Sequence, residues 1–299
     1  MPSFRTLSPE DLSTAALHGH LLSAIAPRPI AFASTISKDG QVNLSPFSFF
    51  NVFGANPPIV VFSPARSVRS NTNKDTLNNV QEVPEVVINV VNYPIVEQMS
   101  LSSTAYPPDV NEFEKAGLTA LASDLVRPPR VAESPASFEC EVLQIIETGP
   151  DGGAGNLIVA KVVRLHLRED YLDENGRLDI PKLDLVARMG GSYYCRASGD
   201  ALFEIPKPIA TLGIGVDQLP AHVKDSPVLT GNNLGRLGNE ERLPGLQEIA
   251  DAKQMAEVKT ILLQHNGQAE QQKLALHHLA KNLIEESNTS LALAVLGII

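Results

Sequence analysis

Short apolar runs separated by turn residues fill the first two thirds of the chain. Residues 29–37 are rich in Ile, Phe, Ala and Thr, and Lys38-Asp39-Gly40 follows them. An Asp-Gly pair between two apolar runs is a strong hairpin signal. The second run, residues 41–51, mixes small polar residues with a leucine and phenylalanines. We therefore predict a hairpin that packs a core with one side and presents small polar groups on the other.

Further runs of this kind follow along the chain. Apolar and β-branched stretches predict strands at residues 59–63, 86–91, 137–147 and 157–167. Short helices are predicted at residues 74–80, 94–103 and 110–116, and an earlier helix is predicted to begin with Ser8 as its N-cap. Strands separated by turns and short helices predict a mainly β fold, an all-β barrel with helical insertions.

The pattern changes after Ser198. Apolar residues at helical spacing, such as Leu246, Ile249 and Val258, dominate from about residue 246 to residue 287. We therefore predict a first domain over residues 1–200 and a C-terminal extension, largely helical, over residues 201–299.

Charge and cysteine content narrow the classes of function. The formal net charge of −10 argues against a general nucleic-acid binder, which would need a basic surface. The two cysteines, Cys140 and Cys195, lie far apart and form no CxxC pair, which disfavours a zinc site or a disulfide framework. The N-terminus lacks the pattern of a signal peptide, and residues 291–299 are too few to span a bilayer. We expect a cytoplasmic protein with no membrane or nucleic-acid partner.

Several common catalytic motifs are missing from the sequence. No GxGxxG run opens a helix after a strand, and there is no Walker A, HExxH or GxSxG motif. The His277-His278 pair lies in a polar helical stretch, where solvated side chains are predicted rather than metal ligands. We therefore predict no metal site.

An ordered set of motifs covers roughly the first two thirds of the chain. It begins with Arg28-Pro29, includes the residue 45–51 run and Lys74-Asp75-Thr76, and ends at Arg188-Met189-Gly190-Gly191 with Tyr193. Between these stand Asn56-Pro57-Pro58, Asn79, Asn89, Phe113, Pro128-Pro129 and Glu139-Cys140-Glu141. In this order the set resembles the flavin reductase-like family of FMN-binding split barrels. The resemblance implies an FMN-binding split β-barrel for the first domain.

The resemblance also implies that the FMN site has two parts. Lys74, Asp75 and Thr76 would form the phosphate half, where a cation and a hydroxyl stand at a helix N-terminus that favours anions. Taken without the resemblance, these three residues form a plain helix cap on a solvated loop. The ring and ribityl half would lie on the hairpin, at Ser34, Thr35, Asn43, Ser45, Pro46, Phe47, Ser48, Phe49 and Asn51.

Other interpretations of these residues stay open. On the hairpin, the alternative is that the hydroxyls pair across the strands in the ordinary way and that the phenylalanines pack in the barrel core. Arg28 is held extended by the proline after it. Two roles stay open for its side chain: contact with the cofactor, or one half of a structural ion pair. Arg188 and Tyr193 form a flexible loop near the flavin or an ordinary surface turn.

The implied function is a flavoprotein oxidoreductase. Electrons would pass from NAD(P)H through FMN to free flavin, ferric iron or a partner oxygenase. No catalytic residue is predicted, because the flavin carries the chemistry. The family places its cofactor at a homodimer interface, so a homodimer is expected. The alternatives are a non-catalytic FMN-binding or storage protein, and an assembly module with a helical tail whose barrel has lost its cofactor.

Overall fold

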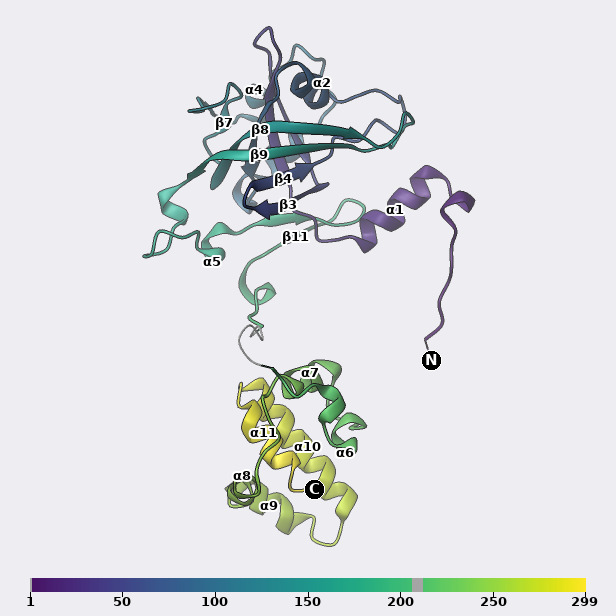
Figure 1. Cartoon of the computed structure of the whole chain (residues 1–299), viewed down its shortest axis with the longest axis vertical. Helices are drawn as coiled ribbons and strands as arrows, with labels where there is room; N and C mark the ends of the chain where they lie inside the picture. The colour runs from purple at the N-terminus through teal and green to yellow at the C-terminus, as the bar shows by residue number, and fades with distance from the viewer. Residues whose placement is uncertain (1, 206–211) are drawn as a thin grey trace. The chain divides into compact units, whose positions relative to one another are not determined.

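The computed structural model describes residues 2–205 and 212–299, which form two compact units, Met1–Phe203 and Glu204–Ile299 (Figure 1). The first unit is mainly β and the second, where it is described, is helical. This confirms the predicted fold class.

A seven-stranded antiparallel sheet forms the body of the first unit. Its strands run in the order β2-β1-β5-β8-β9-β4-β3. Their bounds are β1 Ala31–Ile36, β2 Val42–Phe47, β3 Phe50–Ala55, β4 Pro58–Phe62, β5 Glu85–Val90, β8 Ala136–Glu147 and β9 Asn156–Leu167. The strand predictions are confirmed to within about two residues at most ends, the accuracy expected of boundaries.

The two edge strands of the sheet, β2 and β3, are consecutive in the chain. These strands lie at opposite edges of the sheet, yet only Ser48 and Phe49 connect them in the chain. The Phe49 carbonyl accepts a hydrogen bond of 2.9 Å from the Ser63 amide, beyond the end of β4. The predicted second arm of the hairpin, residues 41–51, is therefore two strands. The chain leaves one edge and joins the other, which a curled sheet permits.

Alternate residues of β1 point into two different cores. Ala31 and Ala33 join Phe62, Ile88 and other side chains of five strands, together with Leu77 and Val80 of helix α2 (Asp75–Glu82), so this cluster fills the barrel. Phe32 faces the other way, into a second cluster with Leu44. That outer cluster is covered by η2 (Tyr93–Ile95), α3 (Val96–Leu101) and α4 (Glu112–Ala116).

Cys140 lies in the barrel core. Its side chain is fully buried. Burial, with a smaller effect of the Glu139 charge, raises the pKa of the Cys140 thiol to about 12. Cys195 lies in β11 (Tyr194–Arg196) and is partly exposed, and both thiols are free.

The remaining elements of the first unit are short. Helix α1 spans Thr14–Ala24, and Ser13 caps it, since its Oγ accepts from the Ala16 amide at 3.2 Å. Ser8, the predicted cap, begins only the single turn η1 (Pro9–Asp11) and makes no side-chain cap bond. The others are β6 Ala120–Leu121, β7 Arg130–Val131, η3 Glu169–Tyr171, α5 Ile180–Leu183, β10 Val186–Arg188 and η4 Gly199–Ala201.

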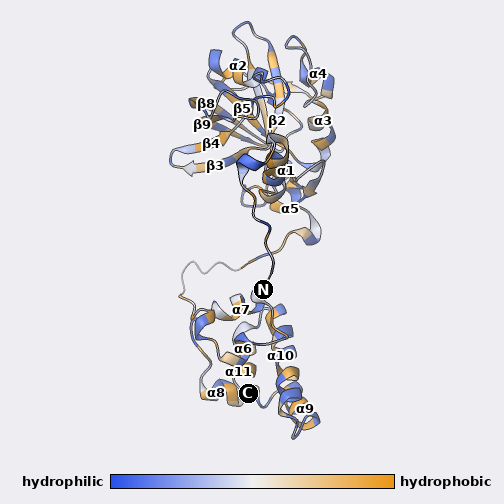
Figure 2. Cartoon of the chain, turned by 90° about the vertical axis from the view of Figure 1, so that its right-hand side faces the viewer, coloured by the Kyte–Doolittle hydropathy of each residue, from blue (hydrophilic) through white to orange (hydrophobic). Residues whose placement is uncertain are grey.

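The second unit is a bundle of short helices with its own core. Its elements are η5 Val216–Gln218, α6 Ala221–Lys224, α7 Gly231–Gly238, α8 Leu246–Ala252, α9 Ala256–Gln264, α10 Ala269–Glu285 and α11 Thr289–Leu296. Apolar residues of α6 to α11 meet in one buried cluster that includes Leu237, Leu276 and Leu293. Hydrophobic and hydrophilic residues both occur along these helices (Figure 2). Helix therefore begins well before the predicted residue 246 and extends past residue 287.

No helix among the described residues is both long and apolar enough to cross a membrane.

Candidate functional site

The structure brings the two predicted halves of the site together. Thr76, in the first turn of α2, donates from Oγ1 to Asn43 Oδ1 on β2 at 2.8 Å. One turn later, Asn79 Nδ2 donates to Thr35 Oγ1 on β1 at 3.1 Å. The N-terminus of α2 is thus fixed to the hairpin by two side-chain bonds between segments about 40 residues apart.

Five of the predicted cofactor ligands have buried side chains: Arg28, Ser34, Thr35, Asn43 and Thr76. Thr35, Asn43 and Thr76 are occupied by the bonds just described. Ser34 is fully buried as well, and by strand alternation it points to the face opposite Thr35, where its Oγ has no hydrogen-bond partner among the described residues. These side chains therefore shape the site from inside the protein.

Glu112 is a buried carboxylate that the sequence analysis did not select. Its Oε1 accepts from Asn43 Nδ2 at 3.1 Å, and its Oε2 accepts from the Leu44 amide at 3.0 Å. Burial raises the pKa of Glu112 above its usual value, and the bonds from Leu44 and Asn43 oppose that effect only in part. The sequence carries a signal at this position, because Asn111 caps α4 and an acid follows it. That pattern indicates only that a helix starts there, not that the acid is buried.

Positive charge lies just before α2. Lys74 is the exposed N-cap residue of the helix and makes no side-chain cap bond. Arg66 is held in place by three bonds: Nε to Asn71 Oδ1 at 2.7 Å, NH2 to the Asn71 carbonyl at 2.6 Å, and NH1 to Asn73 Oδ1 at 2.5 Å. All three acceptors are neutral, so the charge of Arg66 is not neutralised by them. Asp75, between Lys74 and Thr76, is partly exposed.

The residues predicted along the flavin ring divide between the two faces of β2. Ser45 and Phe47 share the face of Asn43, while Pro46 points to the other face. The Phe47 ring packs 5.7 Å from Phe62 between centroids, so it belongs to the barrel core and borders the site.

Ser48, Phe49 and Asn51 stand at the crossing to β3. Ser48 Oγ accepts from Arg28 Nε at 3.4 Å. Phe49 is 37% exposed, with the His18 ring edge-on at 6.1 Å between centroids. Asn51 is exposed, and its Oδ1 accepts from the Val52 amide at 2.8 Å.

Arg28 is a structural clamp rather than half of an ion pair. Its guanidinium donates to the carbonyls of Leu22 at 2.5 Å, Ile25 at 2.7 Å and Met189 at 2.9 Å, besides Ser48. Burial, with a smaller effect of the Arg188 charge, lowers the pKa of Arg28 from its usual value. The end of α1 and the loop after β10 are therefore joined by one buried side chain. These bonds take the place of the ion pair considered from the sequence, and contact of Arg28 with the cofactor stays a prediction.

Arg188 and Tyr193 lie in the hairpin of β10 and β11. Arg188 NH1 donates to the Tyr193 carbonyl at 3.1 Å, and its guanidinium stands 4.6 Å from the centre of the Tyr194 ring. Tyr193 itself is 78% exposed, so its ring is free to meet another molecule. This hairpin touches the β1 segment, because Arg28 and Arg188 exchange backbone bonds of 3.0 and 2.9 Å.

A second buried carboxylate, Glu139, lies away from this region. It accepts from the amides of Asp124, Leu125 and Val126 and from His166 Nε2, at 2.6 to 3.2 Å. Burial acts to raise the pKa of Glu139, but these hydrogen bonds outweigh it, and the pKa is lowered. Although Asp124, Glu139 and His166 lie within 4.8 Å of one another, protein donors already occupy Glu139, and the cluster anchors a loop.

In the helical unit, His277 is fully buried, so the prediction that it is solvated was wrong. Ser226 Oγ lies 2.7 Å from His277 Nδ1, and His222 Nδ1 lies 3.3 Å from His277 Nε2. Burial, followed by the nearby charges of His222 and Lys273, lowers the pKa of His277 to about 4. The side chain is a neutral member of the bundle core.

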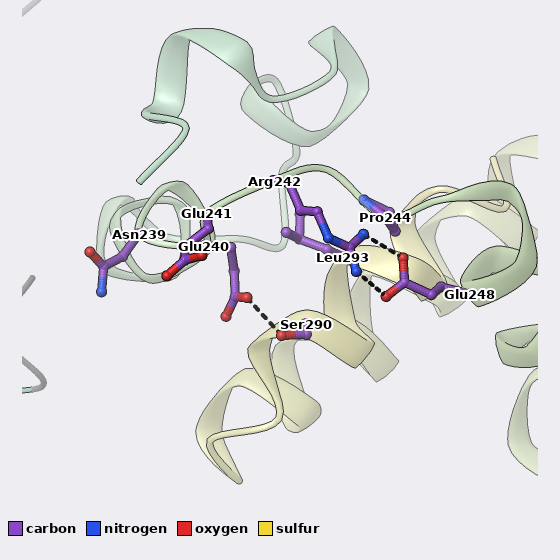
Figure 3. A pocket seen from close by; sticks show the side chains of 8 residues that line it. All are labelled: Asn239, Glu240, Glu241, Arg242, Pro244, Glu248, Ser290 and Leu293. Carbon is purple, nitrogen blue, oxygen red and sulfur yellow. Dashed lines mark hydrogen bonds and ion pairs between the residues drawn. The ribbon is translucent and has the colours of Figure 1, made fainter. Parts of the chain in front are cut away.

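A cavity of about 400 Å³ also lies in the helical unit (Figure 3). Four of its polar side chains pair with one another. Arg242 meets Glu248 in a two-pronged ion pair of 2.7 and 2.8 Å, and Ser290 donates to Glu240 at 2.6 Å. These bonds occupy three of the four charged side chains in the lining, Glu240, Arg242 and Glu248, and we assign no ligand to this cavity.

Comparison with known proteins places the barrel in a family. An uncharacterized protein of Aquifex aeolicus is 38% identical over 189 residues, which are 63% of this chain and 94% of the relative. Nitrilotriacetate monooxygenase component B from Bacillus cereus superposes with a TM-score of 0.64 at 29% identity, over 69% of this chain and 100% of that one. A split barrel protein from Shewanella frigidimarina superposes with a TM-score of 0.57 at 25% identity, over 68% and 100%.

The sequence profile of the flavin reductase like domain matches residues 23–185, more than half of the chain. The match takes in the hairpin, α2, α4 and the long β8–β9 pair, which are the elements that build the candidate site. The chain belongs to the flavin reductase like domain family.

Proposed function

We propose that the barrel unit binds FMN at the junction of β2 and α2 and passes electrons from NAD(P)H to a small acceptor. The observation that carries the proposal is the Thr76–Asn43 bond. It holds a helix N-terminus, preceded by two basic side chains, against the strand predicted to border the ring. This arrangement suits a molecule with a flat polar ring at one end and a phosphate at the other.

The donor set fits a terminal phosphate. The first-turn amides of α2 have no side-chain cap, and helix N-termini attract anions. Lys74 and Arg66 supply positive charge beside them, and Arg66 is already ordered by its asparagine partners. The Thr76 hydroxyl gives its proton to Asn43, so we assign the phosphate to the backbone amide of Thr76 rather than to its side chain.

The ring half of the proposed site rests on β2. This strand is an edge of the sheet, so backbone groups on its outer side lie outside the ladder and can meet the polar edge of a flavin. Ser45 and Ser48 are partly exposed polar groups on this segment, and Phe49 and Tyr193 are exposed aromatic side chains. When bound, FMN supplies the hydride and electron transfer chemistry, while these residues bind and orient it.

We also propose that the unit works as a homodimer. Large apolar side chains remain exposed on the outside of the barrel, with Val52 and Phe53 on β3 and Leu143 and Ile146 on β8 between 40% and 69% exposed. Exposed apolar side chains that gather in a patch mark interaction surfaces, and we propose that these four belong to such a patch. Replacing Val52 and Phe53 with Ser is expected to shift the protein toward monomer in sedimentation velocity, and an unchanged mass would contradict the dimer surface.

The test of the cofactor is direct. The purified protein should be yellow or take up added FMN, with absorbance near ~450 nm, and should bleach when NADH or NADPH is added without oxygen. We expect Lys74→Ala and Arg66→Ala each to weaken FMN binding by about tenfold, the loss of roughly one charged phosphate contact. Lys38→Ala is the matched control, because Lys38 is an exposed lysine on the hairpin turn.

The outcomes separate the candidate functions. A protein that takes up no FMN contradicts every flavin hypothesis. A protein that binds FMN but is reduced by neither nucleotide supports the alternative, a flavin-binding or storage protein. Unchanged affinity in the Lys74 and Arg66 variants would contradict the phosphate assignment alone.

A further inference from the structure

Glu112 lies at the end of a chain of hydrogen bonds that reaches the first turn of α2. Its side chain is 5% exposed. The chain runs from Glu112 Oε1 to Asn43 Nδ2 at 3.1 Å, and from Asn43 Oδ1 to Thr76 Oγ1 at 2.8 Å. It therefore links α4, β2 and α2 through three buried side chains from distant parts of the sequence.

The direction of each bond in this chain is fixed by chemistry. An ionised carboxylate only accepts hydrogen bonds, so Glu112 must face the amide nitrogen of Asn43. The amide oxygen then points at Thr76, which must give its hydroxyl proton to it. The second carboxylate oxygen holds the Leu44 amide on the outer edge of β2, so Glu112 cannot turn away without leaving that amide unpaired.

We propose that Glu112 is a positioning residue for the flavin phosphate. Through Asn43 it fixes Thr76, and with it the first-turn amides of α2, at the place where the phosphate is proposed to bind. This inference rests on the proposed function, and deepens it by adding a residue on α4 that touches neither the phosphate nor the ring.

The Glu112→Gln substitution tests whether the direction of these hydrogen bonds matters, because glutamine has nearly the same volume as glutamate. In Glu112→Gln, the new Nε2 must face either the Leu44 amide or Asn43 Nδ2. The first arrangement sets two donors against each other. In the second, the Asn43 amide must turn over, and its Nδ2 then donates to the Thr76 hydroxyl, which becomes the acceptor and turns its own proton elsewhere. The first arrangement weakens the link that holds the first turn of α2, and the second reverses its direction.

The readout is the ratio of the dissociation constants of riboflavin and FMN, measured by quenching of flavin fluorescence on the full chain. Riboflavin lacks the phosphate, so this ratio isolates the phosphate half of the site. We expect Glu112→Gln to lower the ratio about tenfold, mostly through weaker FMN binding. Thr76→Val, which removes the hydroxyl at the other end of the chain, should lower the ratio by a similar factor.

The double variant tests whether the two residues act through one chain. If they do, Glu112→Gln with Thr76→Val lowers the ratio no further than either single change, because coupled residues are not additive. Additive losses would overturn the inference.

Glu139→Gln is the matched control. Glu139 is also a buried carboxylate that holds backbone amides of the same unit, but its contacts lie at residues 124–126 and 166. The ratio should be unchanged in this variant, even if stability falls. An equal loss in Glu139→Gln, or no loss in Glu112→Gln, would overturn the role of Glu112. If the unaltered protein binds FMN no more tightly than riboflavin, the proposed phosphate site itself fails.

Discussion

The barrel and the helical unit differ in the kind of polar side chain that each buries. The barrel buries two carboxylates, Glu112 and Glu139, and surrounds each with backbone or side-chain donors. The helical unit buries a neutral histidine, His277, between a serine and a second histidine. A buried ion needs donors that only a built network supplies, whereas a neutral imidazole needs one donor and one acceptor. The two units should therefore respond differently to mutation and to acid.

The largest expected losses of stability come from core substitutions, which test whether the two units unfold separately. Phe62→Ala removes a fully buried ring from the barrel and should lower its free energy of unfolding by about 3–5 kcal/mol. Leu276→Ala in α10 should cost the helical unit about 2–5 kcal/mol. In scanning calorimetry, each variant should shift one of two transitions. A single transition that both variants shift would mean that the units unfold together.

Acid should weaken the helical unit first. His277 has a pKa of about 4 when folded, below the value of 6.5 for an unperturbed histidine. A lowered pKa means that the unfolded chain binds the proton more readily, so this stability is present above pH 6.5 and is lost as the pH falls toward 4. The loss amounts to about 3 kcal/mol. The melting temperature of the helical unit, followed from pH 7 to pH 4.5, measures it.

His277→Gln is the control for that pH dependence. Glutamine can accept from Ser226 and donate toward His222 without titrating, so the fall below pH 6.5 should become shallower in this variant. The carboxyl pKa values of Glu112 and Glu139 shift in opposite directions, so the barrel should change less over the same range. Equal falls in both units would contradict the comparison.

The smallest expected effect concerns the Arg28 clamp. Arg28→Lys keeps the charge but loses the planar fork that reaches three carbonyls. The barrel should lose about 1–3 kcal/mol in chemical denaturation, and amide exchange over α1 should become faster. Arg177→Lys, at an exposed turn, should change neither quantity. If exchange over α1 is unaffected by Arg28→Lys, the clamp does not hold that helix.

Alternation of apolar residues was enough to predict the strands of the barrel. It did not predict the crossing at Ser48 and Phe49, because the pattern continues through both residues and only the sheet order places β2 and β3 at opposite edges. Helix α7 was missed because its sequence, GNNLGRLG, is rich in poor helix formers. Packing of Leu237 and the capping pair Thr230 and Asn233 stabilise it instead.

The candidate site was predicted only in part for a similar reason. The hairpin and α2 carry recognisable motifs, so both could be proposed as halves of a site, but sequence spacing cannot show that Asn43 and Thr76 are in contact. Glu112 resembles any acid in the first turn of a helix until the fold buries it. The burial of His277 likewise depends on helices that the sequence did not indicate.

The different settings of the two cysteines give the chain a single accessible thiol. Only a thiolate reacts readily with maleimides, and Cys140 is both enclosed by the barrel and held in its protonated form. Cys195, partly exposed in β11, is left as the position for a dye. It is one residue from Tyr194, whose ring the Arg188 guanidinium faces. Native protein can therefore be labelled at one defined point beside this loop, so that ligand binding there is read as a change in fluorescence.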